Sequence, residues 1–182
     1  KLTIAFCRSR DAAAQSAKRL SLLLSLGSIN SQVVDEILAC YPTPTKQCYL
    51  LSQCVIRGVG FHHAGLHARQ REIVEDLFRQ RQLRIVFSTP TLAMGVDLPA
   101  DAVIVQDVRR RSDQFSSVML QSEMDQMAGR AGRVVSNEVG LFVVCCSFVD
   151  EFVAKDMVSV GRPALLRSKL NSLRSYMGFV LM

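Results

Sequence analysis

The sequence predicts an α/β fold in which a parallel β-sheet is flanked by helices. Short runs rich in β-branched and aromatic residues recur along the chain and are typical of strands. Stretches with apolar residues at three- and four-residue spacing separate them and are typical of helices. Because strands that alternate with helices build parallel sheets, we expect one such sheet. The predicted strands are residues 2–7, 59–62, 83–88, 102–106 and 140–145.

The predicted helices lie between these strands. Residues 12–26 carry apolar side chains at helical spacing, and residues 67–80 place an apolar stripe beneath a charged face. Residues 30–52 contain Pro42-Thr43-Pro44 and have weak periodicity, which predicts a helix, a turn and a second helix inserted before the second strand.

A change of pattern near residue 160 predicts a domain boundary. Residues 1–160 form the main domain in this interpretation, and 161–182 begin a following one. In that last segment, residues 165–182 are expected to form one amphipathic helix, with apolar residues at Leu166, Leu170, Leu173 and Met177.

Composition excludes several classes of protein. The 182 residues include 22 Lys+Arg and 16 Asp+Glu, for a net charge of +6, and 49% are hydrophobic, as in folded globular domains rather than disordered chains. The apolar runs are far shorter than the roughly 20 residues that a membrane-spanning helix needs. The residues from Lys1 onward do not resemble a signal peptide, and we expect the chain to begin inside a larger protein.

The cysteine pattern indicates an intracellular protein, nuclear if the source is a eukaryote. Six cysteines without a CxxC spacing are expected to be reduced and mostly buried. Cys145 and Cys146 are adjacent in a predicted strand, where neighbouring side chains face opposite ways, so they should not share a metal. His63 and His67 have no third ligand nearby in the sequence, and no metal site is predicted.

The segment Gln126-Met127-Ala128-Gly129-Arg130-Ala131-Gly132-Arg133 carries the strongest local signal. Glycine inside a helix costs about 1 kcal/mol relative to alanine, so two glycines beside two alanines indicate close backbone approach. On a helix, Arg130 and Arg133 would project from the same side, which suits contact with a triphosphate. A solvated basic turn at a helix end is the alternative.

Two further segments follow predicted strands. Residues 88–99 include Thr89, Gly95 and Asp97, which are suited to hold sugar and phosphate groups beyond a strand end, although the same residues are common in plain turns. Residues 58–66 lead into a helix whose N–H groups could meet a phosphate at Gly65; alternatively, His62 and His63 satisfy local backbone groups. The glycines there do not match GxGxxG, which disfavours a dinucleotide site.

In this order and spacing, these segments resemble the second RecA-like domain of superfamily two helicases. The similarity is to the superkiller-like branch, whose relatives include the helicase portion of DNA polymerase theta. It covers roughly residues 1–150. Residues 4–10 look like motif four, residues 61–66 with Arg71 like motif four-a, residues 88–100 like motif five, and residues 126–133 like motif six. The resemblance implies a RecA-like parallel sheet flanked by helices, then a C-terminal helix leading into a winged-helix domain.

The resemblance also implies roles for single residues. Arg130 and Arg133 would be arginine fingers reaching the γ-phosphate of ATP, with Gln126 beside it. Gly95 and Asp97 would face the nucleotide; many relatives have asparagine where Asp97 stands. The single-stranded nucleic acid, DNA or RNA, would contact Arg8, Ser9, His63, Gly65 and Thr89.

The sequence lacks a GxxxxGK[ST] loop and an Asp-Glu box, so ATP and Mg²⁺ would be held mainly by an N-terminal RecA-like domain of the same protein. This chain would then be half of a motor, and inactive alone. A non-catalytic module that kept the fold and binds nucleic acid or protein is the alternative, which the intact Gln126, Arg130 and Arg133 disfavour. A small-molecule-binding domain would need a glycine-rich loop after the first strand, where Arg8-Ser9-Arg10 stands. The cluster Arg109-Arg110-Arg111 either contacts phosphates or lies in a solvated loop.

Overall fold

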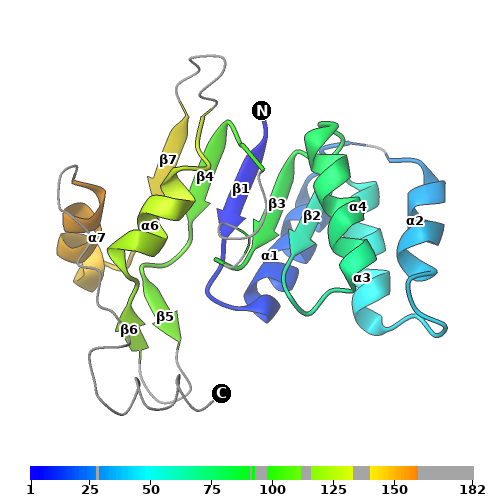
Figure 1. The fold of residues 1–182 in the computed structure, drawn as a ribbon, viewed down its shortest axis with the longest axis horizontal. Coiled ribbons are helices and arrows are strands. Elements are labelled where there is room, and N and C mark those ends of the chain that lie inside the picture. The colour runs from blue at the N-terminus through cyan, green and yellow to red at the C-terminus, as the bar shows by residue number, and fades with distance from the viewer. Residues whose placement is uncertain (28, 91, 93–97, 112–115, 133–139, 160–182) are drawn as a thin grey trace, which may run out of the picture.

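A five-stranded, entirely parallel sheet forms the centre of the molecule (Figure 1). The computed structural model describes residues 1–27, 29–90, 92, 98–111, 116–132 and 140–159. The strand order is β2-β3-β1-β4-β7. This confirms the predicted α/β class and the five predicted strands, which are β1 (Thr3–Phe6), β2 (Val59–His62), β3 (Ile85–Ser88), β4 (Ala102–Val105) and β7 (Leu141–Val144).

Helices cover both faces of the sheet. Figure 1 shows α4 and α6 on the near side and α1 and α3 on the far side, with α2 beyond β2 and α7 beside β7. The inserted helix, turn and helix expected within residues 30–52 are present as α2 and α3, although α3 continues to Ile56. The helices are α1 (Arg10–Leu23), α2 (Ser31–Leu38), α3 (Lys46–Ile56), α4 (Ala68–Arg79), α6 (Gln121–Ala128) and α7 (Glu151–Val158).

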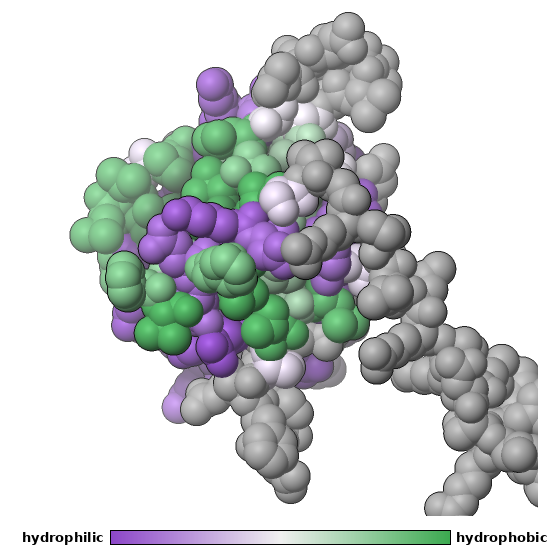
Figure 2. Space-filling model, turned by 90° about the vertical axis from the view of Figure 1, so that its left-hand side faces the viewer, coloured by the Kyte–Doolittle hydropathy of each residue, from purple (hydrophilic) through white to green (hydrophobic). Residues whose placement is uncertain are grey.

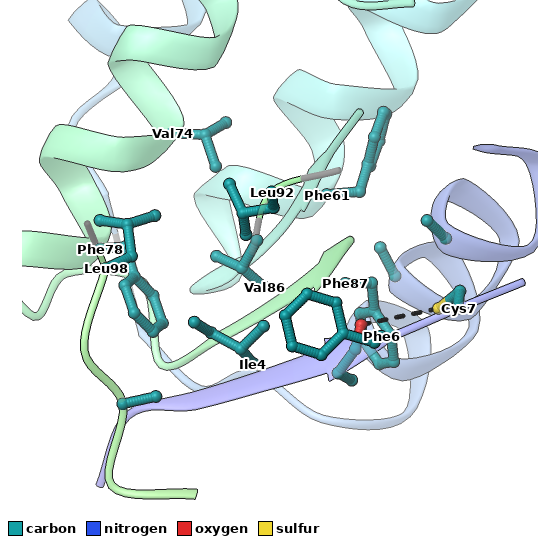
Figure 3. Close-up of a cluster of buried hydrophobic side chains, with 14 of the residues drawn as sticks. Ile4, Phe6, Cys7, Phe61, Val74, Phe78, Val86, Phe87, Leu92 and Leu98 are labelled. Atoms are coloured by element: carbon teal, nitrogen blue, oxygen red, sulfur yellow. Dashed lines mark hydrogen bonds between the residues drawn. The ribbon is translucent and has the colours of Figure 1, made fainter. Parts of the chain in front are cut away.

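Strand alternation divides the core into two layers. Ile4 pairs in register with Val86, and Val86 with Gly60, so these three residues share the face that α4 covers. Figure 3 shows Val74 and Phe78 of α4 directed toward Ile4 and Val86. The opposite face carries Phe61 and Phe87, in register with Ala5, against α1 and α3. Burial on both faces explains why these strands read as continuous apolar runs.

The structure contains an antiparallel hairpin that the sequence analysis did not predict, formed by β5 (Arg109–Arg111) and β6 (Ser116–Val118). Arg109 Nε donates to both carboxylate oxygens of Asp150, at 2.8 and 2.9 Å, and Ser147 Oγ donates to the same group. Arg109 and Ser147 hold the pKa of the Asp150 carboxyl below its usual range. Arg109 therefore ties the hairpin to the start of α7 instead of lying in a solvated loop.

The face that carries α7 exposes several large apolar side chains. Figure 2 shows hydrophobic residues gathered above and below a hydrophilic band on this face. Phe148 and Val149, in the short 3-10 helix η2 (Phe148–Asp150), are 90% and 80% exposed, and Phe152 of α7 is 82% exposed. The domain boundary predicted near residue 160 and the helix predicted at 165–182 lie outside the described residues.

The cysteines are less buried than the sequence analysis expected. Cys7, Cys48 and Cys54 are buried and Cys40 is half-buried, but Cys145 and Cys146 are exposed because β7 ends before them. All six are free thiols, and burial raises the pKa of Cys7 to about 12. Within the described part of the chain, no helix combines the length and the apolar character needed to cross a membrane.

We predict that Gly58→Ala destabilises the fold. Gly58 has φ +76°, and a Cβ there would lie 2.8 Å from the Gly27 nitrogen. Alanine is strained in this left-handed backbone conformation. The strain and the clash together should lower the free energy of unfolding by about 2 kcal/mol. The matched control is Gly27→Ala, whose Cβ would make an ordinary 3.4 Å contact with the Gln82 carbonyl. Urea denaturation measures the free energy of unfolding of both variants. Equal denaturation midpoints would contradict the predicted strain and clash at Gly58.

Candidate functional site

The carboxyl ends of β1, β2 and β3 bring four of the predicted nucleic-acid residues to one edge of the sheet. Arg8 and Ser9 follow β1, His63 follows β2 and Thr89 follows β3. The loops are tied together by backbone: the Thr89 N–H donates to the His62 carbonyl at 3.4 Å, and the Cys7 N–H donates to the Ser88 carbonyl at 2.7 Å. Arg8 and Thr89, which are 81 positions apart in the sequence, therefore belong to one surface.

At this carboxyl edge, Arg8 and Ser9 have different structural roles. Ser9 is the N-cap of α1, and its hydroxyl oxygen accepts the Ala12 N–H at 3.1 Å. The hydroxyl hydrogen remains able to donate to an acceptor from outside. The Arg8 side chain is 54% exposed and lies 3.9 Å from the Asp107 carboxylate, which follows β4. Arg8 thus presents its charge at the surface of the edge.

His63 is buried and held by specific partners. Its Nδ1 accepts the Gly65 N–H at 3.1 Å, its Nε2 lies 3.2 Å from the Gln47 side-chain amide, and its ring stacks on Phe61. Burial, and secondarily the nearby Arg10 charge, lowers the pKa of His63. The lowered pKa leaves the ring neutral at pH 7, and both ring nitrogens face N–H groups, since the Gln47 atom beside Nε2 is its amide nitrogen.

Histidine side chains of the same loop accept backbone N–H groups in the region that the sequence analysis assigned to a phosphate. Gly65 donates its N–H to His63, and His67 Nδ1 caps α4 by accepting the Arg69 N–H at 3.2 Å. His63 and His67 do not share a helix, because α4 begins at Ala68. In the described ranges, no group of three or more His, Cys, Asp or Glu side chains is placed to hold a metal.

His62 points to the opposite face of the sheet from His63. Its Nε2 lies 2.8 Å from the Glu75 carboxylate of α4, whereas its buried Nδ1 has no hydrogen-bond partner among the residues that the structure describes. Burial lowers the pKa of His62 more than Glu75 raises it. His63 thus satisfies a local backbone group, as the alternative interpretation expected, whereas His62 pairs with the Glu75 side chain instead of a backbone group.

A hollow of about 400 Å³ opens beside His63 between the first turns of α1 and α3. Arg10 lines one side and Lys46 and Gln47 the other, with His63 and Gly65 between them. Neither Arg10 nor Lys46 makes a hydrogen bond or ion pair with the described residues. The sequence analysis missed Lys46 and Gln47 as site residues, because they belong to an inserted helix without a recognisable motif.

The predicted nucleotide-facing residues belong to a different part of the molecule. The Ala100 N–H donates to the Arg130 carbonyl at 2.9 Å, and the Gly132 N–H donates to the Ala100 carbonyl at 2.8 Å. Since Ala100 lies two residues before the start of β4, this pairing places Arg130 at the amino edge of the sheet. Gln126 is exposed on the last turn of α6. Gly95, Asp97 and Arg133 lie outside the described residues.

The helical argument for the arginine spacing was wrong. Helix α6 ends at Ala128, Gly129 is its C-cap, and Gly132 has φ +87°, so Arg130 lies beyond the helix. The two glycines therefore end the helix and turn the chain. They do not lie inside a helix, where they would have allowed close backbone approach. Arg130 is positioned by its backbone pairing with Ala100.

A comparison with protein-family models matches residues 45–135, half of the chain, to the Helicase conserved C-terminal domain. The chain belongs to this family. Similar curated proteins are named ATP-dependent DNA helicase Hel308. The protein from Methanococcus vannielii is 40% identical over 132 residues, covering 70% of this chain and 18% of the relative. The protein from Thermoplasma volcanium is 35% identical over 178 residues, covering 89% of this chain and 24% of the relative.

This helicase C-terminal domain spans about a fifth of the length of the curated relatives it matches. Arg8, Ser9, His63 and Thr89 lie at the carboxyl edge of the sheet, whereas the Arg130 backbone lies at the amino edge. Leu92 and Leu98 are buried in the core, at 3% and 1% exposure (Figure 3).

We expect the free energy of unfolding to fall as the pH drops below about 6.5, the ordinary pKa of histidine. Burial lowers the pKa of His62 and His63 in the fold, so the unfolded chain takes up these protons first. The contribution of these two histidines to stability is then fully present above their pKa in the unfolded chain, and it is lost as the pH falls through their lower pKa in the fold. Urea denaturation from pH 8 to pH 5 measures this, with His63→Gln expected to flatten the profile. A native-state NMR titration that places the pKa of His62 or His63 above 6.5 would contradict this explanation of the pH dependence.

Proposed function

We propose that this chain is the second motor domain of an ATP-dependent nucleic-acid helicase of the superkiller-like branch. The observation that carries the proposal is that Arg8, Ser9, His63 and Thr89 lie at one edge of the sheet and Arg130 at the other. A motor must bind a polymer on one surface and sense the nucleotide on another, with a rigid connection between them. The buried parallel sheet is suited to that connection.

In this proposal the carboxyl edge carries part of a single-strand track. Arg8, Ser9, Thr89 and the loop from His63 to Gly65 offer charged and polar donors and no exposed aromatic ring for stacking bases. Such a surface contacts the phosphate backbone without reading sequence. The names of the relatives refer to DNA, which favours a DNA strand here.

The amino edge would complete the ATP site. ATP and Mg²⁺ would be held mainly by an N-terminal RecA-like domain, and the additional length of the relatives leaves room for it and for a following winged-helix domain. Arg130 and Arg133 would place guanidinium charge beside the transferring phosphoryl group, with Gln126 next to it, and Gly95 and Asp97 would face the nucleotide. Positive charge at that point stabilises the negative charge of the transition state.

We predict that Arg130→Ala in the full-length protein lowers the nucleic-acid-stimulated ATPase rate by about 10³-fold or more, as for other arginine fingers. Nucleic-acid affinity should be unchanged, since Arg130 lies at the opposite edge from the track. The control is Arg84→Ala, an exposed arginine just before β3. A normal ATPase rate in Arg130→Ala would exclude the arginine-finger role and favour the non-catalytic binding module.

A further inference from the structure

We infer that the ends of α1, α3 and α4 form a docking surface for an acidic peptide segment of a partner protein that also carries apolar side chains. The apolar part, here called the leucine surface, consists of Leu22, Leu23, Leu24 and Leu26. Arg57 and Arg81 border it with positive charge. This surface lies at the amino edge of the sheet, away from the proposed strand track, so docking there does not depend on the helicase function.

The leucine surface is exposed although leucine is among the residues most often buried in folded proteins. Leu22 and Leu23 lie in the last turn of α1 and are 65% and 79% exposed, and Leu24 and Leu26 follow directly. The positions of α1 that face the core carry two alanines and Ser21, so the helix packs on the sheet without these leucines. Four leucines gathered within five exposed positions are typical of an interaction site.

Direct contacts hold the leucine surface against the ends of two other helices. The Leu26 N–H donates to the carbonyl of Arg57, which follows α3, at 2.9 Å. Arg57 Nη1 in turn donates to the Ser21 carbonyl in the last turn of α1 at 2.8 Å. A Cβ at Gly27 would lie 3.4 Å from the carbonyl of Gln82, which follows α4. Figure 1 shows the connection from α1 to α2 passing the end of α4, at the same end of the sheet as the N-terminus.

The charge around the leucine surface has one sign. Residues 18–27, 53–58 and 80–83 contain four Lys or Arg and no Asp or Glu. Arg57 and Arg81 are exposed and form no ion pair within the described part of the chain. The C-termini of the three helices contribute about −0.5 charge each, which offsets about 1.5 of the four positive charges. An excess of positive charge therefore remains for an acidic ligand.

An acidic and apolar peptide fits this surface better than a nucleic acid or a membrane does. A nucleic-acid backbone would pair with the arginines but leave the leucines uncovered. Helices that lie on membranes carry apolar residues along one whole face, whereas these leucines are confined to the end of α1. A segment that places Asp or Glu beside Leu or Phe would neutralise the arginines and cover the leucines together. Such segments are typical of disordered regions that become ordered on binding.

The test is binding of a fluorescein-labelled peptide with the repeated unit Asp-Leu-Asp-Phe to the full-length protein, measured by fluorescence anisotropy. Leu23→Ser should weaken binding by about five- to tenfold, because a leucine contact is lost. Arg81→Gln should weaken it by about threefold, and added salt should weaken it further, since exposed charge pairs are screened. Arg81 has φ 61°, and glutamine keeps a non-glycine residue at that position.

The matched controls lie on the face that carries α7. Phe148→Ser removes another exposed apolar side chain, and Lys155→Gln removes another exposed cation. Neither should change the affinity for the peptide. The same peptide with Asn in place of every Asp should bind at least tenfold more weakly than the acidic one.

Several outcomes would overturn the docking surface. These are no binding of the acidic peptide, equal binding by the native protein and both surface variants, or equal binding of the Asn peptide. Displacement of the peptide by oligo(dT) would make the surface a nucleic-acid site instead. Sedimentation with vesicles of phosphatidylserine and phosphatidylcholine that Leu23→Ser abolishes, without peptide binding, would make it a membrane site. None of these outcomes alters the ATPase rate expected for Arg130→Ala, so the proposed function is tested separately.

Discussion

The pairing of β1 with two neighbours at once is the constraint on which the rest of the structure depends. β1 bonds in parallel register to β3 on one side and to β4 on the other, and it is buried on both faces. That register sets where each following loop begins, because all five strands end at the same edge. The loop after β1 therefore lies beside those after β2 and β3, and Arg8, His63 and Thr89 meet although they are distant in sequence.

The sheet also explains how one small domain can present two separate surfaces. Thr89 lies at the carboxyl edge, and Ala100 lies at the amino edge, where its backbone pairs with Arg130. Leu92 and Leu98 are buried in the same core as Ile4 and Val86 (Figure 3). A displacement of Leu92 or Leu98 must repack that core, and close-packed cores resist small shifts.

Local patterns predicted the elements well where one physical signal dominated. The strand at residues 59–62 was predicted with its observed bounds, and the prediction for α4 differed by one residue at each end. Residues 126–133 were harder, because glycines and alanines are compatible with both close helix packing and a helix end. The φ of +87° at Gly132 is a backbone property that residue type permits but does not specify.

The sequence by itself determined the class of fold, the order of the five parallel strands and the family, because periodicity and short motifs are local and can be recognised without knowledge of distant partners. The tertiary structure alone decided which polar groups are already satisfied and which remain for a ligand. Arg109 is committed to Asp150, 41 residues away, whereas Arg10 and Lys46 open onto a shared hollow. Such pairings depend on distances between elements, which only the packing of helices on the sheet establishes.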